Sequence, residues 1–234
     1  MARPFVLFFA ILFSAMSTSA LSADPEPVRL KKGDRIVFLG DSITAAGNRG
    51  KGYIQIIRKY LADKKSDLGI ECIGAGISGN KVPDLQRRVE KHVVAKKPTI
   101  VVIYIGINDV WHGERDPKRG TSPDAFEKGL KEVIGKCKKA GAQVVLCTPS
   151  VIGELPKGAN KLDKKLDEYS NISRKVAKEL NLNVCDLRKA FVTYLAKNNS
   201  EKKVRGVLTS DRVHLNAAGN RFVAEAMLKS LGED

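Results

Sequence analysis

Short apolar runs alternate along the chain with segments in which apolar residues recur every three or four positions. The runs predict five strands, at residues 35–39, 69–73, 99–105, 143–147 and 183–185. The periodic segments predict helices, at residues 53–62, 82–95, 124–140, 160–180 with Asn160 as the expected cap, from 187 onward, and 217–231. The strand at 99–105 is almost wholly apolar, as expected when both faces are buried. This alternation predicts a three-layer α/β/α fold with a parallel sheet, in one domain of residues 34–234.

The N-terminal segment has the pattern of a secretory signal peptide. Arg3 precedes an apolar stretch at residues 5–13, and small residues continue to Ala23. Polar residues interrupt this stretch before it reaches the length of about 20 residues that a membrane span needs. We therefore predict a signal peptide at residues 1–23, cleaved near its end, and a short tether at 24–33. The mature protein is expected to be periplasmic or extracellular, without stable membrane insertion.

The charge of the chain changes this picture little. The formal net charge is +15, but the lysines and arginines are dispersed along presumptive helix faces, and aromatic residues make up only 6%. A nucleic-acid-binding protein would gather basic and aromatic side chains in one patch. We therefore expect no nucleic-acid partner, while a weak attraction to an anionic polysaccharide or membrane surface stays open.

The cysteines are expected to be buried thiols. Three of the four, Cys72, Cys147 and Cys185, lie in apolar runs, where cysteine behaves as a small hydrophobic residue. No cysteines and histidines stand close enough in the sequence to suggest a zinc site. We therefore expect no metal.

Small and polar residues follow each of the first three predicted strands. The first strand leads into Gly40-Asp41-Ser42, the second into the glycine-rich segment 74–80, and the third into residues 106–109, which contain Asn108. The carboxyl ends of parallel strands meet at one edge of a sheet, where such folds place their sites. A serine, a flexible glycine loop and an asparagine are therefore expected to share one crevice.

A serine nucleophile needs a base, and the chain has three histidines. His92 lies among charged residues of a predicted helix, and His112 has no carboxylate placed in the sequence to orient it. His214 follows Asp211 by three residues, just before a predicted helix. An aspartate at that spacing can bind one imidazole nitrogen and leave the other facing the serine. His214 with Asp211 is therefore the predicted base.

These residues together predict ester hydrolysis through an acyl-enzyme. Ser42 attacks the ester carbonyl, and His214 takes the serine proton and returns it to the leaving alcohol. The developing oxyanion needs preorganised donors. The candidates are the backbone N–H groups of Ser42 and Gly79 and the side-chain amide of Asn108.

The same residues resemble the markers of the GDSL/SGNH hydrolase family, which are serine, glycine, asparagine and histidine in that order. Here they are Ser42 in GDSI, Gly79 in GISGN, Asn108 in GIND and His214 in DRVH, with Asp211 as the acid. The resemblance covers nearly the whole predicted domain. It implies a flavodoxin-like sheet of order 2-1-3-4-5, ester or thioester hydrolysis, and neither a metal nor an organic cofactor.

That implied strand order also limits the disulfides. Cys72 and Cys185 would lie on opposite edges of the sheet, too far apart for a bond. Cys147 and Cys185 would lie on neighbouring strands, so this strand pair stays open.

The sequence says less about the substrate, which we expect to be a small-molecule or glycan ester. Residues 111–123 and 148–161 follow the third and fourth strands and should frame the acyl and alcohol pockets. Asp41 and Trp111 are the candidate substrate-binding residues, although Trp111 has a packing role as its alternative. Arg212 and Leu215 stand where the family commonly has glycine and proline. We predict an esterase for short acyl groups, such as acetyl esters of carbohydrates, with lysophospholipase or thioesterase activity as the alternative.

Two other functions fit the sequence less well. Residues 74–79 have the glycine spacing of a dinucleotide-binding loop, but that motif needs an acidic residue about 20 positions later, and residues 93–98 contain none. A non-catalytic glycan-binding module would have no need for Ser42, Asn108, Asp211 and His214 together.

Overall fold

The computed structural model describes residues 25–114 and 116–233, so the predicted signal peptide lies outside the described residues. Five parallel strands form one sheet in the order β2-β1-β3-β4-β5. They are β1 (Arg35–Gly40), β2 (Glu71–Gly76), β3 (Ile100–Tyr104), β4 (Gln143–Cys147) and β5 (Asn183–Cys185). The predicted α/β fold and its strand order are confirmed.

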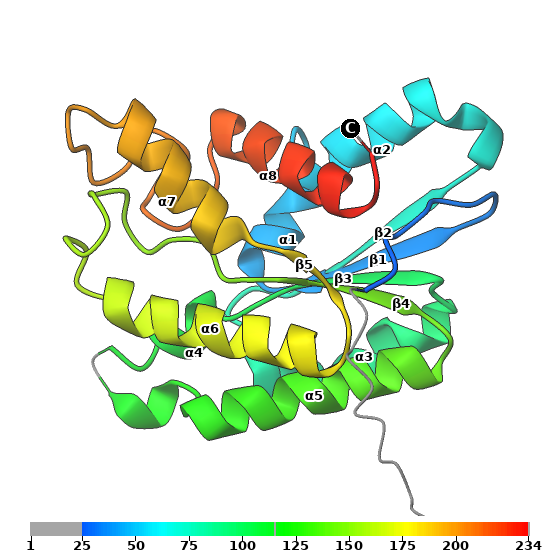
Figure 1. The fold of residues 1–234 in the computed structure, drawn as a ribbon, viewed down its shortest axis with the longest axis horizontal. Helices are drawn as coiled ribbons and strands as arrows, with labels where there is room; N and C mark the ends of the chain where they lie inside the picture. The colour runs from blue at the N-terminus through cyan, green and yellow to red at the C-terminus, as the bar shows by residue number, and fades with distance from the viewer. Residues whose placement is uncertain (1–24, 115, 234) are drawn as a thin grey trace, which may run out of the picture.

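Helices cover both faces of this sheet (Figure 1). The longer ones are α2 (Tyr53–Lys64), α3 (Val82–His92), α5 (Pro123–Lys139), α6 (Asp163–Glu179), α7 (Leu187–Asn198) and α8 (Ala217–Ser230). Two short helices, α1 (Ser42–Gly47) and α4 (Ile107–Trp111), begin at or just after strand ends. In Figure 1, α1, α2, α7 and α8 lie on one side of the sheet, and α3, α4, α5 and α6 lie on the other.

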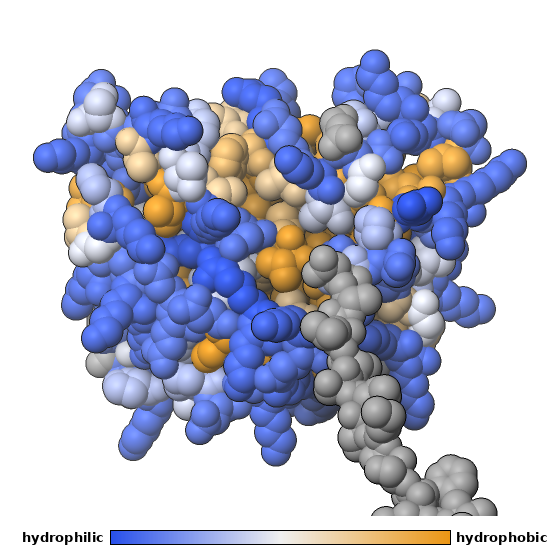
Figure 2. All heavy atoms as spheres, viewed as in Figure 1, coloured by the Kyte–Doolittle hydropathy of each residue, from blue (hydrophilic) through white to orange (hydrophobic). Residues whose placement is uncertain are grey.

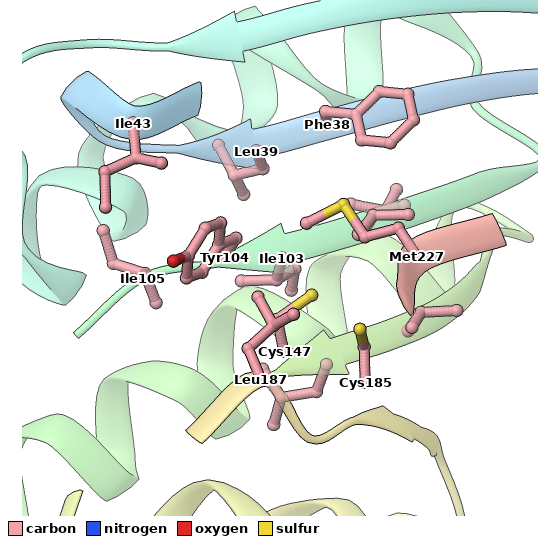
Figure 3. Packing of buried hydrophobic residues seen from close by; sticks show 14 of the residues in the cluster. Phe38, Leu39, Ile43, Ile103, Tyr104, Ile105, Cys147, Cys185, Leu187 and Met227 are labelled. Atoms are coloured by element: carbon pink, nitrogen blue, oxygen red, sulfur yellow. The ribbon is translucent and has the colours of Figure 1, made fainter. Parts of the chain in front are cut away.

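The core lies between the sheet and these helical layers. All five residues of β3 are buried, as its apolar sequence predicts for a strand with helices on both faces. Phe38 of β1, Tyr104 of β3 and Met227 of α8 are buried members of this core (Figure 3). Cys147 and Cys185 stand opposite each other on β4 and β5, yet all four cysteines are free and buried. The expectation of buried thiols is confirmed.

The surface is polar and cross-linked by ion pairs. Figure 2 shows hydrophilic residues over most of the visible face, with hydrophobic ones mainly towards its middle. Glu127 on α5 binds Lys131 at 2.7 Å and Lys175 of α6 at 2.9 Å, so basic residues on these helices are matched by an acid. None of the helices in the described part of the chain is long and apolar enough to cross a membrane.

The predicted start of one helix was wrong. Asn160 does not cap α6, which begins at Asp163 after Leu162. The Asn160 side chain instead bonds the backbone of Leu155, and Asp163 accepts the backbone N–H groups of Gly158 and Asn160. These bonds hold the loop that precedes the helix, so the Asn160 side chain is used within that loop and does not cap α6.

Candidate active site

The serine stands where β1 turns directly into a helix. Asp41 is the N-cap of α1, and its Oδ1 atom accepts the backbone N–H of Ile43 at 2.9 Å. Ser42 is the first residue of α1 and is half-buried. A Cβ at position 40 would collide with the side chain of Thr44 and the carbonyl of Tyr104. Glycine is therefore needed there for close packing of the turn against β3.

The histidine reaches this serine from the loop that precedes α8. The Nε2 atom of His214 lies 2.8 Å from Ser42 Oγ, across 172 positions of sequence. The Nδ1 atom of His214 lies 2.6 Å from Asp211 Oδ2. The structure thus places the three side chains in one hydrogen-bonded chain, the arrangement that makes a serine hydroxyl nucleophilic.

The aspartate is held by its own loop. Its Oδ1 atom accepts the backbone N–H groups of Val213 at 3.0 Å and His214 at 2.8 Å, which leaves Oδ2 aimed at the imidazole. Partial burial raises the pKa of Asp211, but the hydrogen bonds from the His214 side chain and these backbone amides outweigh it and hold the pKa below its usual value. Asp211 is therefore ionised at neutral pH and favours a proton on Nδ1 of His214.

The second and third strand-end loops meet beside the serine loop. Asn108 on α4 is 4% exposed, and its Nδ2 atom donates to the Asn80 carbonyl at 3.1 Å. The same nitrogen lies 3.5 Å from Asp41 Oδ2, at the outer limit of a hydrogen bond. Gly79 is exposed and has a φ of +76°, with open space where a Cβ would stand. Glycine is favoured at this position by its backbone conformation.

Asp41, which the sequence predicts to contact the substrate, is buried in the structure. Its side chain is only 2% exposed, between the cap of α1 and the amide of Asn108. Burial raises the pKa of Asp41 to about 7, and the nearby Asp109, itself fully buried, adds to this. Burial also raises the pKa of Asp109 to about 6. These contacts favour a role for Asp41 in positioning Ser42 and Asn108 over the direct substrate contact expected from the sequence.

We expect the substitution Asp41→Asn to stabilise the protein more at pH 8 than at pH 5. The pKa of Asp41 is raised on folding, so the native state binds the proton more tightly and the wild type loses stability as pH rises towards 7 and above. Asparagine caps helices about as well and never ionises. One pKa unit corresponds to 1.36 kcal/mol, and about two units separate pH 5 from the raised pKa of about 7, so the gain between pH 5 and pH 8 is at most about 3 kcal/mol. Urea unfolding at both pH values measures it.

Asp116→Asn is the matched control, because Asp116 also caps a short helix but is exposed. Its effect on the free energy of unfolding at pH 5 and at pH 8 is the reference for the loss of an exposed cap carboxylate. An Asp41→Asn effect with no more pH dependence than this reference would contradict the buried charge.

A cavity of about 130 Å³ is lined by residues that stand near Asn108 and His214 in the sequence, and its lining includes none of Ser42, Asp211 and His214. Its lining includes Trp111, three residues after Asn108, and Arg212, two residues before His214, together with parts of residues 152–162. The segments expected to frame the substrate pockets therefore do meet. Arg212 has a φ of +87°, a conformation that non-glycine residues rarely adopt. Because the family commonly has glycine near this position, the backbone geometry explains that preference.

A larger cavity, of about 630 Å³, lies between α2 and α8. Its described lining residues include Lys51, Tyr60 and Arg221 but none of Ser42, Asp211 and His214. Among residues 25–114 and 116–233, no group of three or more histidines, cysteines and acids is placed to hold a metal ion. Neither of these two cavities is lined by Ser42, Asp211 or His214, so cavity size does not locate the triad.

Sequence reasoning missed two residues of this region, Asn80 and Arg88. The Arg88 guanidinium bonds the Asn80 side chain, and Asn80 in turn bonds Asn108. A signal for Arg88 was present in the sequence. It stands three residues after Leu85 and one before Val89, on the apolar face of its helix, where an arginine needs a reason to be.

Comparisons with known proteins agree with this geometry. The sequence matches the GDSL-like Lipase/Acylhydrolase family over residues 38–222. The acetylxylan esterase of Geobacillus stearothermophilus is 31% identical over 222 residues, which cover 88% of this chain and 97% of the relative. The crystal structure of an acetyl xylan esterase, AlAXEase, superposes with a TM-score of 0.81 at 48% identity, and the match covers 84% of this chain and 99% of that one.

The solved structure of the Geobacillus enzyme has a TM-score of 0.78 at 30% identity, with 88% of this chain and 97% of that one covered. Further structures of the same enzyme are catalytic mutants, in which a serine, an aspartate or a histidine is replaced by alanine. In that enzyme the aspartate precedes the histidine by three residues.

Proposed function

Because the chain belongs to the GDSL-like lipase/acylhydrolase family and is a carboxylic ester hydrolase like its relatives, we propose that it removes acetyl groups from carbohydrates by a Ser-His-Asp mechanism. One observation carries the mechanism, namely the hydrogen-bonded chain from Ser42 through His214 to Asp211. The spacing of Asp211 and His214 is also that of the two residues replaced in the catalytic mutants of the Geobacillus enzyme.

In this mechanism Ser42 Oγ attacks the carbonyl carbon of the ester while Nε2 of His214 takes the hydroxyl proton. Asp211 stabilises the imidazolium that forms. The backbone N–H groups of Ser42 and Gly79 and the amide of Asn108 bind the oxyanion. Collapse of this intermediate releases the alcohol, which takes the proton from His214 and leaves an acetyl group on Ser42. Water, activated by the same imidazole, then repeats these steps and releases acetate.

The names of the relatives support a short acyl group, because the acetylxylan esterases are named for acetyl esters. Trp111 and Arg212 line a cavity of about 130 Å³ and give it one aromatic face and one guanidinium, groups that stack on sugar rings and bond hydroxyls. The alcohol side of the substrate is then a sugar, as the names of the acetylxylan esterases suggest for those proteins.

A substrate series tests this proposal. We expect the protein to release acetate from acetylated xylo-oligosaccharides, and to hydrolyse p-nitrophenyl esters with kcat/KM falling at least about tenfold from acetate to octanoate, because each added methylene must find room in a small pocket. Steady-state kinetics with each ester, and acetate release measured for the oligosaccharide, give the result. Trp111→Ala should raise KM for the oligosaccharide and leave that for p-nitrophenyl acetate nearly unchanged.

Lysophosphatidylcholine is the competing substrate in the same series. A preference for it, or for octanoate over acetate, would replace the proposal by a lysophospholipase or long-chain esterase. Absence of acetate release from every acetylated sugar, with p-nitrophenyl acetate still hydrolysed, would contradict the carbohydrate assignment alone.

Export stays a prediction from the sequence of residues 1–23. An exported esterase would meet acetylated polysaccharides outside the cytoplasm, which agrees with the proposed substrate.

A further inference from the structure

Arg88 is a buried cation to which no carboxylate of residues 25–114 and 116–233 is hydrogen-bonded. It lies on α3, below the ends of β1 and β2, and is 9% exposed. Its three hydrogen bonds all go to uncharged oxygen atoms. Burial lowers the pKa of Arg88, and the acids Asp84 and Asp41 oppose this only through longer-range attraction. Burying a charge in this way costs stability unless the charge is well compensated.

Those three bonds join the two loops that carry the oxyanion donors. Nη2 donates to the carbonyl of Gly40 at 2.7 Å, two residues before Ser42. Nη1 donates to the carbonyl of Ala75 at 2.9 Å, at the end of β2. Nε donates to Oδ1 of Asn80 at 2.6 Å, directly after Gly79. One rigid guanidinium therefore holds the start of the serine loop and both ends of the glycine loop.

The same bonds extend to the third donor. The backbone carbonyl of Asn80, whose side chain Arg88 binds, accepts the amide of Asn108 at 3.1 Å. Asn108 thus takes its orientation from a residue that Arg88 fixes. Its second N–H makes only the long contact of 3.5 Å with Asp41 Oδ2, which a substrate oxygen can replace.

We propose that Arg88 is a positioning residue for ester hydrolysis, which sets the spacing of the three oxyanion donors Ser42 N, Gly79 N and Asn108 Nδ2 without touching the substrate. This inference rests on the proposed function. An oxyanion hole works only when its donors stand 2.7–3.1 Å from the developing charge, so small shifts between loops are costly. The planar fork of arginine holds its three acceptors in fixed directions from separate nitrogen atoms, whereas the three donors of lysine share one rotating nitrogen.

A second buried arginine shows what a purely structural one looks like. Arg188 is 2% exposed and is paired with Asp163 at 2.8 Å and Asp167 at 2.7 Å, between α7 and α6. Its other partners include the carbonyl of Ser150. Arg188 has carboxylates to balance its charge and contacts none of the three donor loops. Arg88 hydrogen-bonds the serine loop and the glycine loop, and none of these bonds goes to a carboxylate. Arg188→Met is therefore the matched control for Arg88→Met.

The experiment measures kcat, KM and thermal midpoint for the full-length mature protein with p-nitrophenyl acetate. Arg88→Met should lower kcat about 100-fold per folded molecule, the scale of a misplacement of about 1 Å in an active site, with KM nearly unchanged. Arg88→Lys should fall between Arg88→Met and the wild type. Acylation and deacylation both pass through an oxyanion, so kcat reports the loss whichever of these two steps limits it. Arg188→Met should lower the thermal midpoint and leave kcat per folded molecule unchanged.

Asn80→Ala gives an independent test, since Asn80 lies in a half-exposed loop and its removal does not disturb the core. If Arg88 acts through Asn80, the double variant Arg88→Lys/Asn80→Ala should lose hardly more kcat than the worse single variant. If the losses of kcat in the two single variants multiply in the double variant, or if Arg88→Lys keeps the wild-type kcat, the positioning role is overturned. A wild type inactive on all acetyl esters would instead overturn the proposed function, so the two failures are distinct.

Discussion

Replacing Ser42 by alanine is expected to abolish ester hydrolysis, with kcat falling by a factor of about a million, the scale seen when a Ser-His-Asp enzyme loses its nucleophile. The hydroxyl that lies 2.8 Å from His214 Nε2 disappears, and no acyl-enzyme can form. Ser42 opens α1 and is half-buried, so alanine should change the free energy of unfolding by less than about 1 kcal/mol. Kinetics with p-nitrophenyl acetate and urea unfolding measure the two effects.

Ser78→Ala is the control, because Ser78 is an exposed serine directly before Gly79. This variant should keep its activity. A sulfonyl fluoride should modify the wild type and Ser78→Ala once, at Ser42, and leave Ser42→Ala unmodified. Activity retained in Ser42→Ala, or label found on another residue, would refute the assignment of the nucleophile.

Replacing Asp211 by asparagine is expected to lower kcat by about 10,000-fold, as the equivalent change does in another Ser-His-Asp enzyme. In the wild type, Nδ1 of His214 lies 2.6 Å from a carboxylate oxygen of Asp211. In the variant, asparagine can turn its amide N–H groups towards the same nitrogen. That contact favours the tautomer with its proton on Nε2, which cannot accept the proton of Ser42. Kinetics across pH 5 to 9 should show no recovery at any pH, because the defect is one of tautomer and not of charge alone.

Asp211→Ala separates this role from a purely structural one. Asp211 also accepts two backbone N–H groups of its loop, from Val213 and His214, which the Oδ1 atom of asparagine can still do and alanine cannot. If Asp211 served only as a loop cap, the asparagine variant would be nearly fully active and the alanine variant would lose both stability and rate. If it orients the histidine, both variants should be slow, and only alanine should lower the thermal midpoint.

The strands were predictable because their signal is local and strong. Residues 99–105 form a continuous apolar run, and β3 occupies Ile100–Tyr104 of it. The order of the sheet came from the resemblance, since hydrophobic periodicity says which segments are strands but not which of them are neighbours. The short helices α1 and α4 carry too few residues to show a period. Asn160 misled because its side chain bonds its own loop instead of the helix.

The site was predictable where one short segment holds the relevant chemistry. Asp211 and His214 share one loop, so their spacing alone indicates that they bind each other, and the structure places them 2.6 Å apart. The burial of Asp41 was not predictable, because a polar residue at a strand end is exposed or buried according to the loops that cover it. The same holds for Arg88, whose acceptors come from two strands and a loop.

The sequence by itself determined where the strands and the longer helices lie, which side chains can do the chemistry, and that Asp211 is spaced to bind His214. These properties depend on neighbours within a few positions, where propensity, periodicity and spacing act. Only the tertiary structure decided that His214 meets Ser42 across 172 positions of sequence. It also decided that the Asp41 side chain is buried and that Arg88 hydrogen-bonds both the serine loop and the glycine loop. Those contacts depend on how whole elements pack, and packing is a property of the assembled sheet and helices that no single segment contains.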